Sequence, residues 1–152
     1  MNISTRGRYG LRALLEIAVQ PQKKPVTIRD ISEKQQMSVT YLEQILYRLK
    51  KAGIVRSIRG AKGGYVLARK GEKITVSQII SALDGPISIS HCDLPKMREK
   101  SCIGPSTCVS RILWKKLENL IEDVLSSVTL ADLQKQTLGM KHVKLLNYGR
   151  RK

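Results

Sequence analysis

The stretch that decides the fold is "SVTYLEQILYRLKKAGIVRSIRGAKGGYVLAR", residues 38–69. Its first part repeats apolar residues at three- and four-residue steps, which places them on one face of a helix: Leu42, Ile45, Leu46 and Leu49. Ser38 is a favourable cap for this helix, and Gly53 would end it after Lys50 and Lys51. The sequence therefore predicts a helix between Ser38 and Gly53.

The second part of the stretch changes to the alternating period of strands. Two strand-like segments, one with Ile54, Val55 and Ile58 and the other at residues 65–67, flank a turn that is rich in glycine. Such a pair of segments predicts a β-hairpin. Arg59 and Lys62 give the tip of this hairpin a positive charge.

A shorter helix is expected just before residue 38. Thr27, with Asp30 three residues later, resembles a capping box, and Ile28 and Ile31 would anchor the helix. Two short helices joined by a tight turn form a helix-turn-helix. With the hairpin that follows, residues 1–84 are expected to form a winged helix-turn-helix domain for DNA binding.

The longest helical pattern of the chain is "TCVSRILWKKLENLIEDVLSSV", residues 107–128. Its apolar stripe is broad, and a lone helix must bury such a stripe against something. A second copy of the chain is the expected partner, and packing within one subunit is the alternative. The fold class expected is mainly α with a small β-hairpin. The remaining parts are a cysteine-bearing loop at 85–108, a dimerisation helix and a short C-terminal helix at 109–138, and a basic flexible tail at 139–152.

The net charge of the chain is +16, and its pI is about 10.1. Such a balance favours a polyanionic partner, most often nucleic acid. Residues 1–83 carry 16 of the 28 Lys and Arg residues but five of the 12 Asp and Glu residues, so nucleic acid is expected to bind the first half. An RNA-associated protein is the alternative, although an aromatic content of 4% offers few stacking surfaces. Neither a membrane span nor a signal peptide is recognisable, which predicts a cytoplasmic location.

The second helix of a helix-turn-helix enters the major groove of double-stranded DNA. The residues expected to contact DNA are Ser38, Thr40, Tyr41, Glu43 and Gln44 in that helix and Arg56, Arg59 and Lys62 in the hairpin. Gln44 can bond adenine, whereas Glu43 can accept from cytosine and otherwise repels phosphate. The structural alternatives are capping alone for Ser38 and Thr40 and a solvated surface for Glu43 and the hairpin cations.

All three cysteines, Cys92, Cys102 and Cys108, lie in one short segment. Their odd number argues against a disulfide framework, and three thiols on one loop can converge on an iron–sulfur cluster. The intervals of nine and five residues differ from the tight knuckles of most zinc sites. Zinc, redox-active thiols and inert packing remain alternatives. An enzyme is not expected, because His91 beside Cys92 lacks a third orienting group.

Several motifs together resemble the Rrf family of bacterial winged-helix transcription regulators. They are "STRGRYGLRALLEIA", the stretch at 38–69, "ISALDGPIS" and "C…CIGPSTC…LW", and the resemblance covers about residues 1–135. The three cysteines followed by "LW" are similar to the cluster-binding branch of the family. The resemblance implies a homodimer that crosses its long helices and reads a palindromic operator. It also implies one 2Fe-2S cluster per subunit and a role in sensing cluster status to control iron–sulfur cluster biogenesis genes.

The resemblance also implies the ligands of the cluster. By motif position these are Cys92, Cys102 and Cys108. Where relatives place a fourth ligand, this chain has Arg111 or Arg8. The fourth ligand is therefore left among His91, Asp93, Glu99 and His142. Some family members lack the cluster and respond to a partner protein of cysteine metabolism or to thiol oxidation, which is the alternative function.

Overall fold

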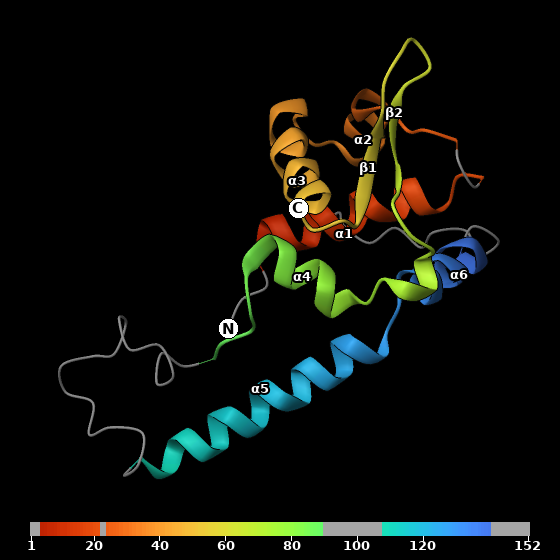
Figure 1. The fold of residues 1–152 in the computed structure, drawn as a ribbon. Coiled ribbons are helices and arrows are strands. Elements are labelled where there is room, and N and C mark those ends of the chain that lie inside the picture. Colours follow the sequence, from red (N-terminus) through yellow and green to blue (C-terminus); the bar gives the residue numbers. More distant parts are fainter. Residues whose placement is uncertain (1–3, 22–23, 90–107, 141–152) are drawn as a thin grey trace, which may run out of the picture.

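The computed structural model of the chain describes residues 4–21, 24–89 and 108–140. Figure 1 shows its elements, which are α1 (Thr5–Ala18), α2 (Ile28–Gln35), α3 (Val39–Lys51), β1 (Val55–Ile58), β2 (Gly64–Leu67), the short 3-10 helix η1 (Gly71–Lys73), α4 (Val76–Asp84), α5 (Val109–Ser127) and α6 (Leu130–Met140). The expected fold class is confirmed: helices dominate, one hairpin follows the helix-turn-helix, and a long helix lies in the C-terminal half.

The helix-turn-helix is set by local capping bonds. A capping box starts α2, because the Asp30 N–H donates to the Thr27 hydroxyl at 3.1 Å and the Thr27 N–H donates to the Asp30 carboxylate at 3.3 Å. At the other end, Gln36 adopts the left-handed conformation with φ of 53°. Ser38 then caps α3 by accepting the Tyr41 N–H at 3.3 Å. The start signals that the sequence carries for both helices are confirmed.

The hairpin is anchored by a third segment that the sequence did not reveal. Strands β1 and β2 are antiparallel, with Val55 opposite Leu67. On the other edge of β2, Tyr65 exchanges two backbone hydrogen bonds with Val26, at 2.8 and 3.0 Å. The wing is therefore fixed to the chain that enters α2.

Replacing Gly64 with alanine is expected to destabilise the fold by about 2 kcal/mol or more. Gly64 has φ of 151°, and a Cβ there would lie 2.5 Å from the carbonyl oxygen of Val26. Urea unfolding followed by circular dichroism measures the change. Gly139→Ala in α6 is the matched control, because its Cβ meets no atom within 4 Å and alanine favours a helix. Equal unfolding midpoints for the two variants would contradict the expectation.

The core lies among α1, α3, α4 and the base of the hairpin. All four apolar residues expected on the inner face of α3 are 0% exposed, and so are Leu14 of α1 and Ile79 of α4. Gly10 lets α1 approach α4 closely, because a Cβ at this position would lie 2.1 Å from the buried Leu83 Cδ1. Interdigitated packing of this kind gives each helix a defined position.

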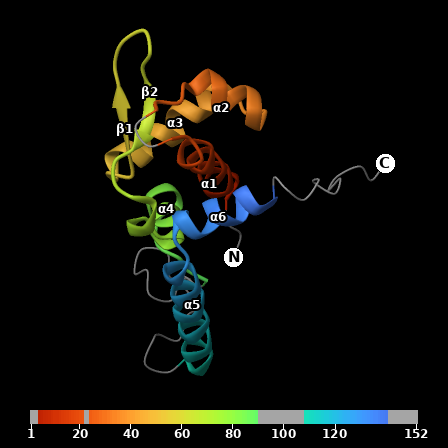
Figure 2. The same cartoon turned by 90° about the vertical axis from the view of Figure 1, so that its right-hand side faces the viewer.

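The last helix returns to the first and completes this core. Leu130 of α6 is 0% exposed, and its N–H donates to the carbonyl of Ile74 at 2.8 Å. The Gln134 amide donates to the carbonyl of Ala18 at 2.7 Å, which ties α6 to the end of α1. Between α4 and α6, helix α5 extends away from the rest of the fold (Figures 1 and 2).

Candidate nucleic-acid interface and cysteine segment

The start of α3 gathers four of the residues expected to contact DNA on one exposed surface. Thr40, Glu43 and Gln44 are exposed, and the buried stripe occupies the opposite face of the helix. Ser38 is exposed as well, and its hydroxyl accepts the capping bond from Tyr41. The hydroxyl proton of Ser38 can still be donated outward. Hydrogen-bonding groups that match base edges therefore point away from the core together.

Two further residues of this surface were missed by sequence reasoning. Val39 is 44% exposed and Tyr47 is 67% exposed, both unusually high for large apolar side chains. Tyr47 lies one turn after Glu43, outside the four-residue apolar stripe of α3. That spacing was the available signal, since a residue at i+4 shares the face of its predecessor.

Tyr41 has a structural contact besides any contact with DNA. Its ring packs edge-on against the ring of Tyr9, with centroids 6.0 Å apart and an interplanar angle of 78°. The guanidinium of Arg12 lies 5.4 Å from the centroid of Tyr9 and donates to the Gln35 side chain at 2.8 Å. This cluster fixes the orientation of α3 relative to α1 and α2.

The hairpin divides its three candidate cations between two places. Arg59 and Lys62 are exposed at the tip, beyond the last paired residues. Ser57 faces α3, because Lys50 Nζ donates to its hydroxyl at 2.9 Å. Neighbouring residues of a strand point to opposite faces, so Arg56 points to the other side of the hairpin. The structure therefore does not bring Arg56 together with the α3 residues.

Cys108 is the one cysteine within the described residues, and it occupies the N-cap position of α5. Its Sγ lies 3.0 Å from the hydroxyl of Ser110. The hydrogen bond from Ser110, followed by that from the backbone N–H of Arg111, lowers the pKa of the Cys108 thiol below its ordinary value. The thiolate, which is the form that binds metals, is favoured at this position.

The other metal-ligand candidates lie outside the described residues: Cys92, Cys102, His91, Asp93, Glu99 and His142. Within the described ranges, no three metal-binding side chains gather. Both borders of the segment at 90–107 are held by α5, because Cys108 begins the helix and the Ile89 N–H donates to the Glu118 carboxylate at 2.8 Å. Ten residues of helix separate Cys108 from Glu118, about 15 Å along the axis, so the two described residues that border the segment both lie against α5.

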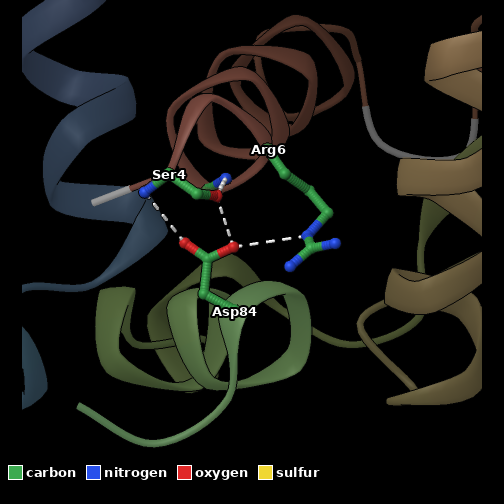
Figure 3. Close-up of polar contacts among 4 residues, drawn as sticks. Ser4, Arg6 and Asp84 are labelled. Carbon is green, nitrogen blue, oxygen red and sulfur yellow. Dashed lines mark hydrogen bonds and ion pairs between the residues drawn. The ribbon is translucent and has the colours of Figure 1, made fainter. Parts of the chain in front are cut away.

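A polar cluster ties the end of α4, which leads into the cysteine segment, to the start of α1. Figure 3 shows Asp84 accepting hydrogen bonds from the backbone N–H and the hydroxyl of Ser4, the former at 3.2 Å. The Nε of Arg6 lies 3.3 Å from the same carboxylate. The Ser4 hydroxyl in turn caps α1 by accepting the Gly7 N–H at 3.0 Å. The start of α1 and the end of α4 therefore share one carboxylate.

Helix α5 has two different faces. The inner face meets α4 through polar groups, where the buried Ser77 hydroxyl donates to the carboxylate of Glu122. The outer face exposes an apolar ridge, here called the α5 ridge: Val109 at 81%, Ile112 at 71%, Leu113 at 51%, Leu120 at 51% and Val124 at 61%. In the single subunit, the α5 ridge, which is part of the apolar stripe expected from the sequence, is exposed to water. Among the described helices, none is long and apolar enough to cross a membrane.

Comparison with known proteins assigns the family. A family model described as "Rrf2: Iron-dependent Transcriptional regulator" matches residues 3–136. The HTH-type transcriptional regulator IscR of Pectobacterium atrosepticum is 39% identical over 133 residues, which cover 88% of this chain and 79% of the relative. IscR of Vibrio campbellii is 37% identical over 135 residues, which cover 89% and 78%.

Two solved structures are similar to this fold over nearly their full length. The global cysteine regulator CymR of B. subtilis has a TM-score of 0.74 and 38% identity, and the match covers 90% of this chain and 98% of that one. IscR of T. potens has a TM-score of 0.73 and 34% identity, with 97% and 94% covered. The winged fold, the exposed helix and the sequence match agree, and the chain belongs to the Rrf2 family of DNA-binding transcriptional regulators.

Proposed function

We propose that this regulator senses iron–sulfur cluster status through a 2Fe-2S cluster and controls the genes of iron–sulfur cluster biogenesis in the cytoplasm. The observation that carries the proposal is the Cys108 thiol. It lies at the start of α5 with a lowered pKa, next to a segment that supplies two further cysteines. Relatives named IscR support the same assignment.

The available donors fit such a cluster. Thiolates are the usual ligands of iron–sulfur clusters, and Cys108 is poised to supply one. Cys92 and Cys102 are proposed as the second and third ligands, and His91, Asp93, Glu99 and His142 remain the candidates for the fourth. A bound cluster supplies a redox- and iron-sensitive group. Cys108 would hold this group at the start of α5, which contacts α4 through Ser77 and Glu122, and the end of α4 contacts α1 through Asp84.

DNA is proposed to be read by the exposed start of α3. Base edges or phosphates in the major groove would be contacted by Ser38, Thr40, Glu43 and Gln44. The hairpin tip would bind phosphates of the DNA backbone through Arg59 and Lys62. Tyr41 would contribute mainly by holding α3 in place, as its packing against Tyr9 indicates. Because Tyr47 lies on the same exposed face, it would reach the DNA backbone beyond Glu43.

Replacing Glu43 with alanine is expected to lower specificity more than affinity. A carboxylate that faces DNA repels phosphate unless a cytosine amino group is present, so its removal should reduce the ratio of operator to random-DNA affinity by about tenfold or more. Fluorescence anisotropy with both duplexes measures this ratio. Glu33→Ala on the exposed face of α2 removes the same charge and should leave the ratio unchanged. If the ratio of operator to random-DNA affinity falls equally in both variants, Glu43 does not select a base.

A homodimer is proposed because the α5 ridge is apolar and exposed in the single subunit. Antiparallel or crossed packing of two α5 helices would remove the ridge from water. Two subunits related by a two-fold axis would present two α3 helices, which suits a palindromic operator with one half-site per subunit.

A second candidate is a cluster-free regulator of cysteine metabolism that responds to a partner protein or to thiol oxidation. The observation that favours it is the similarity to CymR, with a TM-score of 0.74. This candidate predicts that operator binding is the same whatever the metal status of the protein.

An absorption spectrum of protein purified without oxygen separates the two candidates. Iron and acid-labile sulfide are assayed on the same sample. A brown protein with visible charge-transfer bands and nearly equal iron and sulfide supports the cluster sensor. If the protein stays colourless after anaerobic reconstitution, the cluster sensor is excluded and the cluster-free regulator is the remaining candidate.

A further inference from the structure

A cavity of about 300 Å³ lies beside the base of the hairpin and is not explained by DNA or cluster binding. It opens between the end of α1, the base of the hairpin, η1 and α6, on the side of the hairpin away from α3 (Figure 1). Its lining combines apolar side chains, Ile17 and Val66 among them, with four cations and one carboxylate. The charged residues are Lys24, Arg56, Arg69, Lys70 and Glu72.

Hydrogen bonds hold parts of the cavity wall in place. The Arg69 guanidinium donates to the Gln78 side chain at 3.1 Å, and Gln78 itself belongs to the capping box of α4. The Gln134 amide closes α6 against α1 through the Ala18 carbonyl. Arg56 points to this side of the hairpin because Ser57 faces α3. The cavity is therefore formed by elements that are fixed to one another.

Charge and size together define the class of ligand. Four cations against one carboxylate make the cavity strongly electropositive. Arginine side chains bind carboxylates and phosphates in paired hydrogen bonds. Because the volume lies at the lower end of the range for small-molecule sites, a metabolite-sized ligand fits. We propose that this cavity binds a small organic dianion, a phosphate monoester or a dicarboxylate, whose short body rests on Ile17 and Val66.

A DNA phosphate is the less favoured occupant. The surface that carries Glu43 and Gln44 lies with α3 on the other side of the hairpin. The apolar part of the lining also has no counterpart in a sugar–phosphate backbone. A ligand in this cavity would contact both the hairpin and α6. Its binding would be a second regulatory signal, independent of the cluster.

Isothermal titration of the full-length protein tests the proposal, with glycerol 3-phosphate and succinate as probes at constant ionic strength. We expect at least one probe to bind with a Kd below about 1 mM, and Arg56→Ala to weaken that binding at least about tenfold. The probe that binds identifies the phosphate or the dicarboxylate class. Neutral glycerol should not bind.

Lys73→Ala is the matched control, since Lys73 is an exposed cation of η1 that does not line the cavity. It should bind the probe like the wild type. No binding of either probe at 10 mM (roughly the weakest useful affinity), or equal weakening in both variants, would overturn the proposal. It would also be overturned if operator DNA displaced the probe and Arg56→Ala weakened operator binding without any probe. That result would make the cavity a DNA-backbone contact.

Discussion

A Cys108→Ala variant is expected to be purified without oxygen as a colourless, folded protein. The substitution removes the thiol that we propose as a cluster ligand, whose thiolate form is favoured by the hydrogen bonds from Ser110 and from the Arg111 backbone. A 2Fe-2S cluster held by the two remaining cysteines and one weaker ligand would not survive purification. The expected loss is therefore nearly all of the visible absorption and of the bound iron. Cys102→Ala should give the same result.

Ser110→Ala is the matched control for this prediction. It removes the hydroxyl that lies 3.0 Å from the Cys108 Sγ but leaves the thiol itself. The pKa of Cys108 should then rise towards its ordinary value, so the thiolate is protonated at a higher pH than in the wild type, while the cluster still assembles at alkaline pH. If Cys108→Ala keeps its iron, Cys108 is not a ligand. If it loses its circular dichroism signal, the cysteine is structural and the sensor role is wrong.

A Leu113→Asp, Leu120→Asp double variant is expected to be monomeric and to bind the operator at least about 100-fold more weakly. Both side chains are 51% exposed on the α5 ridge and would be buried by a second copy. Burying two carboxylates in an apolar interface costs several kcal/mol, and a monomer reads only one half-site. Light scattering measures the mass, and anisotropy measures operator binding.

Lys73→Asp provides the matched control for the ridge. Lys73 is exposed on η1, outside α5, and its replacement makes the subunit more negative by the same two charges as the double variant. It should remain a dimer. Since the ridge lies outside the core of the subunit, the double variant should still unfold cooperatively in urea, but at a lower midpoint than the wild type because association stabilises the folded state. A double variant that stays dimeric would show that the dimer forms through another surface.

The helix-turn-helix could be predicted from the sequence because its signals are local. Thr27, Asp30 and Ser38 form the capping bonds that their spacing indicates, and the apolar period of α3 matches its buried face. The pairing of Val26 with Tyr65 and the return of Leu130 to the core join residues far apart in the chain. Capping signals and apolar period are local, so they do not identify partners that lie far apart in the sequence.

The candidate site was predictable to a similar degree. The period of α3 placed Glu43 and Gln44 on its exposed face, as the structure has them. Strand alternation places Arg56 and Ser57 on opposite faces of the hairpin. Which of the two faces meets α3 follows only from the Lys50–Ser57 hydrogen bond, which the sequence does not reveal. In α5, apolar period alone gave one broad stripe. Glu118 and Glu122, one turn apart, mark the side that faces its own subunit through polar contacts.

The separation between the completed core and the α5 ridge has a consequence for the order of folding and assembly. Leu14, Leu83 and Leu130 are buried without any partner subunit, so each chain can collapse before it meets another. Refolding should then show an early phase whose rate does not depend on protein concentration, followed by a bimolecular phase that quickens as concentration rises. Between the two phases the ridge stays open to water, and during this interval aggregation competes with correct pairing.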